Sequence, residues 1–180
     1  MPFRSARRIL SFMTELDHIW SQLLETAASK ADETQRKHVA EYLRLKASND
    51  AIRELGVRWL FDTVIEIAGP AMSGQHPVTI EREDPHTFIR GTSKMVGSRL
   101  FIRQGVRCLT VEAGWARIPS DGIMQKGALA YARIEHFGMQ EKGGEIRLVH
   151  GEDLPQWLDD TDNFIDIRGL QLHFDIFIGQ

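Results

Sequence analysis

His173 and Asp175 are of residue types that bind divalent transition metals, and they stand two positions apart near the end of the chain. The run around them alternates apolar and polar residues, which predicts a strand with both side chains on one face. Asp166, and His150 at the end of an earlier predicted strand, can lie beside them. A divalent transition metal held there would activate water, as in a metal-dependent hydrolase or nuclease. The alternative is a solvated polar face opposite the apolar residues of the same strand.

A second group of metal-ligating types lies within residues 76–86, which hold His76, His86 and three acidic residues. Carboxylate and imidazole ligands in one loop can bind a cation. Two prolines and the absence of any apolar period favour a solvated connector instead.

Arginines form the third group. Arg99 and Arg103 share one face of a predicted strand with Phe101, and Arg133 shares a face of another with Tyr131. Arginines beside aromatic rings can hold phosphates while the rings stack on bases. We therefore take Arg99, Arg103 and Arg133 as candidates for binding an anionic ligand. The alternative is pairing within the molecule, with Glu112, Glu135, Glu145 and the acidic C-terminal segment.

The charge distribution bears on that choice. Residues 89–150 hold ten basic and five acidic side chains, whereas residues 151–180 hold one basic and seven acidic, and the whole chain has a net charge of −3. A basic middle followed by an acidic segment is most simply explained by internal pairing. Nucleic acid is therefore a less favoured partner than protein.

Common catalytic motifs are missing from the sequence. It contains no phosphate-binding loop of the Gly-x-x-x-x-Gly-Lys type, no Gly-x-Gly-x-x-Gly, no Gly-x-Ser-x-Gly, no His-Glu-x-x-His and no Cys-x-x-Cys. We therefore expect a non-enzymatic binding or assembly module, with the metal-dependent hydrolase or nuclease as the alternative.

The elements that carry these residues differ along the chain. Apolar residues recur at helical spacing from Ile9 to Ala27, which predicts a helix over residues 5–29 with a broad apolar stripe. Such a stripe needs cover from the sheet, a second copy of the chain or another protein. The candidate interface consists of Phe12, Leu16, Ile19 and Leu23.

Two further helices are predicted. Asp32 and Gln35 have the spacing of a capping box and begin the second, which should lie antiparallel to the first. Residues 48–50 are Ser-Asn-Asp, which favours a break and a new helix start. The third helix should end at Gly69-Pro70.

From Thr87 onward the pattern is that of strands joined by tight turns, with Gln104-Gly105 as a hairpin turn. We expect six or seven strands in an antiparallel meander, either a curled sheet or a small barrel. The last strands are 164–168 and 170–178. The class is therefore α+β, with a helical segment 1–69, a polar connector 70–86 and a β segment 87–180 in one integrated domain.

Size and composition agree with this. The chain has 180 residues, which is long enough to bury a hydrophobic core. Its one cysteine, Cys108, cannot form an internal disulfide. A reducing, cytoplasmic location fits, and no apolar run approaches the roughly 18 residues of a membrane span.

Overall fold

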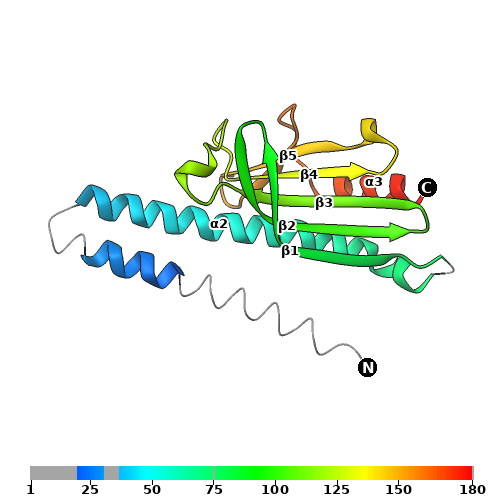
Figure 1. Cartoon of the computed structure of the whole chain (residues 1–180), viewed down its shortest axis with the longest axis horizontal. Coiled ribbons are helices and arrows are strands. Elements are labelled where there is room, and N and C mark those ends of the chain that lie inside the picture. The colour runs from blue at the N-terminus through cyan, green and yellow to red at the C-terminus, as the bar shows by residue number, and fades with distance from the viewer. Residues whose placement is uncertain (1–19, 31–36, 75, 180) are drawn as a thin grey trace, which may run out of the picture. The chain divides into compact units, whose positions relative to one another are not determined.

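The computed structural model describes residues 20–30, 37–74 and 76–179. In these ranges the chain forms a helix over residues 20–30, a long helix α2 (Lys37–Ala68), an antiparallel sheet and a C-terminal helix α3 (Ile167–Ile178) (Figure 1). The predicted α+β class is confirmed. The chain divides into two compact units, and the boundary falls inside α2, between Ala51 and Ile52. The six strands are β1 (Thr79–Arg90), β2 (Ser93–Gln104), β3 (Arg107–Trp115), β4 (Ala130–His136), β5 (Gly144–Val149) and β6 (Gln156–Leu158).

The described part of the first unit is a pair of antiparallel helices, as predicted. Ala28 packs with Ala40, and Lys46 lies 5.8 Å from the ring centre of Trp20, so the two helices run in opposite directions. The small alanine side chains allow close approach of the helix backbones. The predicted capping box at residues 32–35 lies outside the described residues.

α2 continues through residues 48–50, where a break was predicted, so that prediction is wrong. The reason is that Asp50 does not cap a new helix. Its carboxylate accepts a hydrogen bond from Lys46 Nζ at 2.9 Å, an i,i+4 ion pair that supports an uninterrupted helix. Two predicted helices are thus one.

α2 ends where expected, but by a different device. Ala68 is followed by a 3₁₀ helix (Gly69–Ser73), and Pro70 at its start prevents the α-helical hydrogen bonds from continuing. β1 then begins at Thr79, eight residues before the expected Thr87, so the second half of the predicted connector is strand. The first half of this edge strand carries charged residues on both faces, so the sequence shows no alternation of apolar and polar residues there.

The strands follow one another in sequence order, from β1 at one edge to β6 at the other, so the predicted meander is confirmed. The sheet is open rather than closed into a barrel. β2 and β3 are joined at the predicted hairpin, with Gly105 in the left-handed conformation that the turn requires (φ 58°). Leu100 and Ile102 face the core and Arg103 faces solvent, as the alternation predicted.

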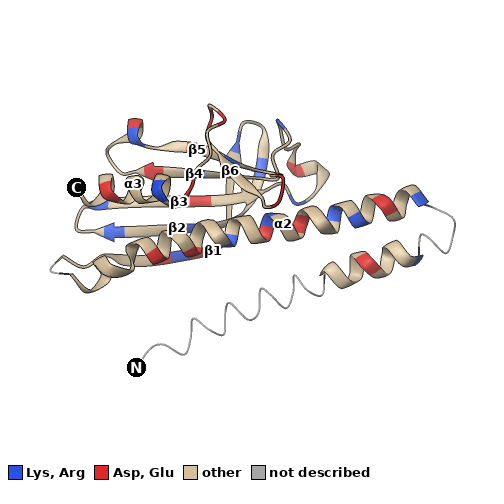
Figure 2. Cartoon of the chain, turned by 180° about the vertical axis from the view of Figure 1, so that it is seen from behind, with Lys and Arg blue, Asp and Glu red and all other residues tan. Residues whose placement is uncertain are grey.

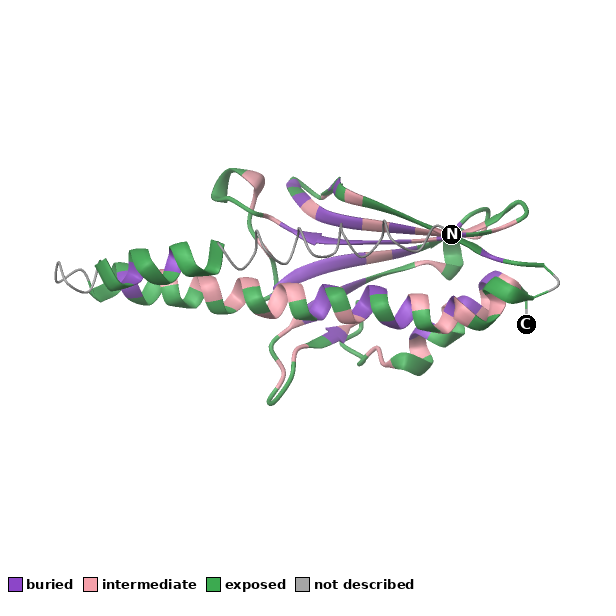
Figure 3. Cartoon of the chain, turned by 90° about the horizontal axis from the view of Figure 1, so that it is seen from below, coloured by how far each residue is buried: buried purple, intermediate pink, exposed green. Residues whose placement is uncertain are grey.

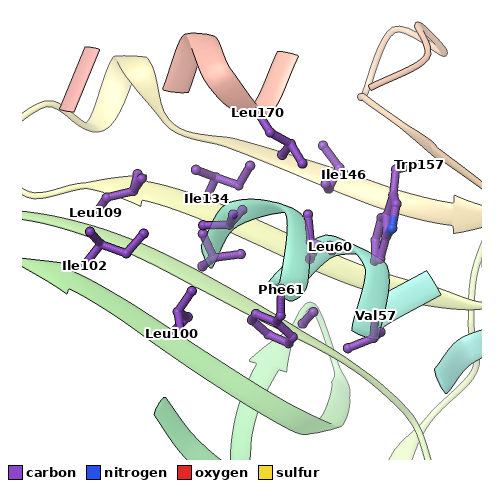
Figure 4. Packing of buried hydrophobic residues seen from close by; sticks show 14 of the residues in the cluster. Val57, Leu60, Phe61, Leu100, Ile102, Leu109, Ile134, Ile146, Trp157 and Leu170 are labelled. Carbon is purple, nitrogen blue, oxygen red and sulfur yellow. The ribbon is translucent and has the colours of Figure 1, made fainter. Parts of the chain in front are cut away.

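The core lies on one face of the sheet, which the second half of α2 and α3 cover. Figure 3 shows that most buried residues of α2 lie in its C-terminal half. Leu60 and Phe61 from α2 point at the strands, and Leu170 from α3 joins them (Figure 4). Two polar contacts fix the helix on the sheet: Trp157 Nε1 donates to the Gly56 carbonyl at 3.1 Å, and Arg53 Nε to the Leu129 carbonyl at 2.8 Å.

The other face of the sheet is concave, because the end of the β1–β2 hairpin curls over it (Figure 1). A bulge interrupts β1 between Glu83 and His86. Beyond the bulge, toward the turn, the β1–β2 hairpin buries side chains on the concave side of the sheet. Phe88 and Met95 of the hairpin form a second small core there with Ala128 and Tyr131.

A pair of facing glycines allows this curl. Gly97 of β2 lies opposite Gly114 of β3. A Cβ on Gly97 would collide with the Ala113 carbonyl oxygen, and a Cβ on Gly114 would come within 2.7 Å of the Val96 carbonyl oxygen. The two backbones approach more closely than any side chain would permit.

α3 corrects the prediction that residues 164–168 and 170–178 are strands. The run alternates apolar and polar residues, but Leu170, Phe174 and Phe177 also recur at helical spacing, and these are the residues that α3 buries. Asp166 Oδ1 accepts from the Gly169 amide at 3.0 Å and caps the helix N-terminus. Gly179 ends it in the left-handed conformation.

Candidate functional site

The concave face carries a row of alternating charges across five strands. Glu83, Arg99, Glu112, Arg133 and Glu145 stand opposite one another in register, one from each of β1 to β5. We call these five residues the charge row. Opposite charges on directly facing strand positions attract, so the row favours this register over a slipped one.

Contacts along the charge row are short. Arg99 Nη2 lies 2.6 Å from Glu83 Oε2, and Arg133 lies 3.3 Å from both Glu112 and Glu145. Arg90, at the tip of the curled hairpin, adds a contact of 3.1 Å to Glu145 and lies over the ring of Tyr131. The row is therefore tied to the hairpin that covers it.

His86 of β1 contacts two acids of the charge row, Glu112 and Glu83. Its Nε2 donates to Glu112 Oε2 at 2.9 Å, and its Nδ1 lies 3.6 Å from Glu83 Oε1. Both His86 and Glu112 are buried, whereas Glu83 is half exposed. The hydrogen bond from Arg99, with smaller contributions from the charges of Arg99 and His86, lowers the pKa of Glu83.

A hollow of about 710 Å³ opens beside the charge row on the same face. Phe101, Cys108 and Thr110 form its floor, and Phe137 with the β4–β5 turn borders it. Its charged side chains are Arg103, Arg133, Glu135 and Glu145. Its volume is in the range of small-molecule sites, which combine apolar walls with a few polar groups.

The four residues predicted to hold a metal do not form one site. Asp166 caps α3, Asp175 accepts a hydrogen bond from Gln171 at 2.7 Å, and His150 is exposed after β5. Because α3 is a helix, His173 and Asp175 do not share a face as they would on a strand. No group of three or more His, Cys, Asp or Glu residues in the described ranges is placed to hold a metal ion.

His173 instead meets His136 at the end of β4. His136 Nε2 and His173 Nδ1 lie 3.1 Å apart and the rings stack at 5.4 Å. His136 is buried on the core face, and its Nδ1 has no hydrogen-bond partner. Burial, and then the neighbouring His173, lowers the pKa of His136, and burial lowers the pKa of His173.

This pair predicts acid sensitivity near neutral pH. A histidine whose pKa is lowered by folding binds fewer protons in the folded than in the unfolded state. Stability should therefore be fully present above the unfolded pKa of about 6.5 and fall as the pH drops below it. We expect a lower melting temperature at about pH 5 than at pH 7.5, measured by differential scanning calorimetry.

Between pH 7.5 and pH 5 the melting temperature of the His173→Gln variant should fall less than that of the wild type. The variant keeps only one of the two histidines whose pKa is lowered by folding. His76→Gln, at an exposed position, is the matched control and should behave as the wild type. Parallel slopes for His173→Gln and the wild type would contradict the assignment.

The three arginines predicted to bind an anion all face the concave side and all have acidic partners. Arg99 pairs with Glu83, and Arg103 Nε lies 3.6 Å from Glu81. Arg133 contacts all three acids that the alternative interpretation named, Glu112, Glu135 and Glu145. Figure 2 shows the same mixing of signs along α2.

Of the residues predicted as an interface, Phe12, Leu16 and Ile19 lie outside the described residues. Leu23 is described, and it is exposed. Other large apolar side chains of the same unit share that exposure: Trp20, Val39, Tyr42 and Leu45.

Sequence reasoning missed two pairings. His86 and Glu112 are 26 residues apart, and only the strand register and the hairpin curl bring them together. His136 gave a signal that we did not use: it stands in phase with the core residues Ala132 and Ile134, so the alternation of β4 places a histidine in the core.

Comparison of the chain with models of protein families, with curated proteins and with solved structures gave no match. Among the helices that the structure describes, none has the length and apolar character required to cross a membrane.

Proposed function

We propose that this protein is a non-enzymatic assembly module that self-associates through its first unit. The supporting observation is the exposure of large apolar side chains there: Trp20, Leu23, Tyr42 and Leu45 are 51%, 56%, 59% and 60% exposed. The described buried residues of that unit are Leu24, Ala28 and Ala40, which make a small core. Two helices with so little buried area need further cover to be stable.

A second copy of the chain is the partner we favour. Two helical hairpins pack into a four-helix bundle whose core takes up apolar stripes of this kind. Residues 1–68 hold ten basic and ten acidic side chains, so two copies of this region do not repel each other by net charge.

Sedimentation in solution tests the proposal. We expect the full chain, of 20.5 kDa, to sediment as a dimer or larger species at about 50 μM. At this concentration an interface with a dissociation constant of about 1 μM is mostly formed. The double variant Leu23→Glu with Leu45→Glu should dissociate at least about tenfold more readily, because charges at the centre of an apolar interface are costly.

Ala51→Glu is the matched control. It introduces one glutamate, half the charge that the double variant adds, at an exposed position on α2, nine residues and so about two and a half turns from Tyr42, on the opposite side of the helix. Its association should be unchanged. A monomeric wild type at the same concentration would reject self-association, and equal effects of the control and the double variant would reject this surface.

A further inference from the structure

We infer that the hollow on the concave face binds a short peptide with free termini, two or three residues long and carrying an aromatic side chain. The inference rests on the charged groups of the hollow and is independent of the proposed self-association. Two of those groups are bound firmly within the molecule, and two are held loosely enough to contact a ligand.

Arg133 and Glu145 are the firmly bound pair. They contact each other at 3.3 Å, and each has a further partner in Glu112 or Arg90. A ligand would have to break these contacts to use either side chain. They therefore form a fixed wall rather than binding groups.

Arg103 and Glu135 are the loosely held pair. The ion pair of Arg103 with Glu81 is 3.6 Å long and that of Glu135 with Arg133 is 3.9 Å, both beyond a good hydrogen bond. The two side chains are 46% and 58% exposed. Glu135 can turn toward a ligand at little cost, because exposed ion pairs contribute little to stability. Arg103 also lies over the ring of Phe101, 4.9 Å from its centre, and a ligand carboxylate would meet the exposed guanidinium in that position.

The spacing of these two groups sets the length of the ligand. Arg103 faces Cys108 and Glu135 faces Thr110, so their Cα atoms lie two strands across and two residues along, about 12 Å apart. An extended chain covers about 3.3–3.6 Å per residue, so two or three residues place an ammonium group near Glu135 and a carboxylate near Arg103.

The surface between the charges suits a peptide. Thr110 carries a hydroxyl group on the floor that can bond to a peptide group, and the floor is otherwise Phe101 and Cys108. Phe137 at the border is 75% exposed, and an aromatic side chain of the ligand would cover its ring. Arg99 and Arg103 already lie over the ring of Phe101 at 4.6 and 4.9 Å, which leaves Phe137 as the stacking partner.

The experiment is a calorimetric titration of the full chain with the tripeptide Gly-Phe-Gly in four forms: free, N-acetylated, C-amidated and blocked at both ends. We expect the free form to bind best and each block to weaken binding about tenfold, since each removes one charge-assisted contact. Binding of the doubly blocked form as tight as that of the free form, or no binding of the free form at millimolar concentration, would overturn the inference.

Variants assign the two ends. Arg103→Gln should bind the free peptide about tenfold more weakly and become indifferent to C-amidation, and Glu135→Gln should do the same for N-acetylation. Phe137→Ala should weaken all four forms. Arg168→Gln and Glu152→Gln, at exposed positions outside the hollow, are the controls and should bind as the wild type. If both blocks still matter equally in Arg103→Gln and Glu135→Gln, the inference fails.

Discussion

Replacing Glu112 with alanine should lower the free energy of unfolding by about 3–5 kcal/mol, the cost of breaking a buried charged contact. One carboxylate oxygen accepts from His86 at 2.9 Å, and the other lies 3.3 Å from Arg133. Alanine would leave the buried His86 ring without its acceptor and would interrupt the charge row at its centre. Urea denaturation followed by circular dichroism measures the change.

Glu135→Ala is the control for that measurement. Glu135 lies on the same face, but it is exposed and its ion pair is 3.9 Å long. Its loss should cost less than about 1 kcal/mol. If Glu112→Ala were no more damaging than Glu135→Ala, the buried contact would contribute nothing to stability.

Replacing Gly97 with alanine should be nearly as damaging, with a loss of about 3 kcal/mol, at the upper end of the range for overpacked sites. The new methyl group would press on the Ala113 carbonyl and force β2 away from β3 beside Gly114. Since the curl of the hairpin depends on this close approach, the contact between Arg90 and Glu145 should weaken too.

Gly144→Ala is the matched control, because an added Cβ on that strand glycine meets nothing within 4 Å. Its stability should equal or slightly exceed that of the wild type. Urea denaturation again gives the values, and equal effects of the two substitutions would show that the curl does not need a glycine at position 97.

The sequence predicted the larger elements well where one period dominated. The alternation of Leu100 and Ile102 against Arg99 and Arg103 predicted a strand with the correct core face, and Gln104-Gly105 predicted its hairpin turn, although β2 begins earlier, at Ser93. The last helix was predicted as a strand because residues 170–178 fit both the two-residue alternation of a strand and the 3.6-residue repeat of a helix. The two-residue alternation was the more regular of the two. Asp166 as an N-cap and Gly179 as a C-cap were the signals that would have decided it.

The site was harder to predict, because it depends on register and curvature. The alternative interpretation of the arginines, pairing within the molecule with Glu112, Glu135 and Glu145, describes Arg133, which contacts all three acids. That these acids and arginines fall in one row follows from the strand pairing, which a single sequence does not specify. The approach of Arg90 to Glu145, 55 residues away, follows from the curl at Gly97 and Gly114.

β1 has one further consequence, for how the chain avoids aggregation. It is an edge strand of the described sheet, with twelve residues and one neighbour, and such an edge can recruit another strand. Pro85 has no amide hydrogen, and the bulge between Glu83 and His86 interrupts the regular backbone spacing. An incoming strand could therefore pair over only a few residues on either side. At this edge of the sheet, the proline and the bulge thus oppose strand addition by another chain and the sheet-to-sheet polymerisation that it would begin.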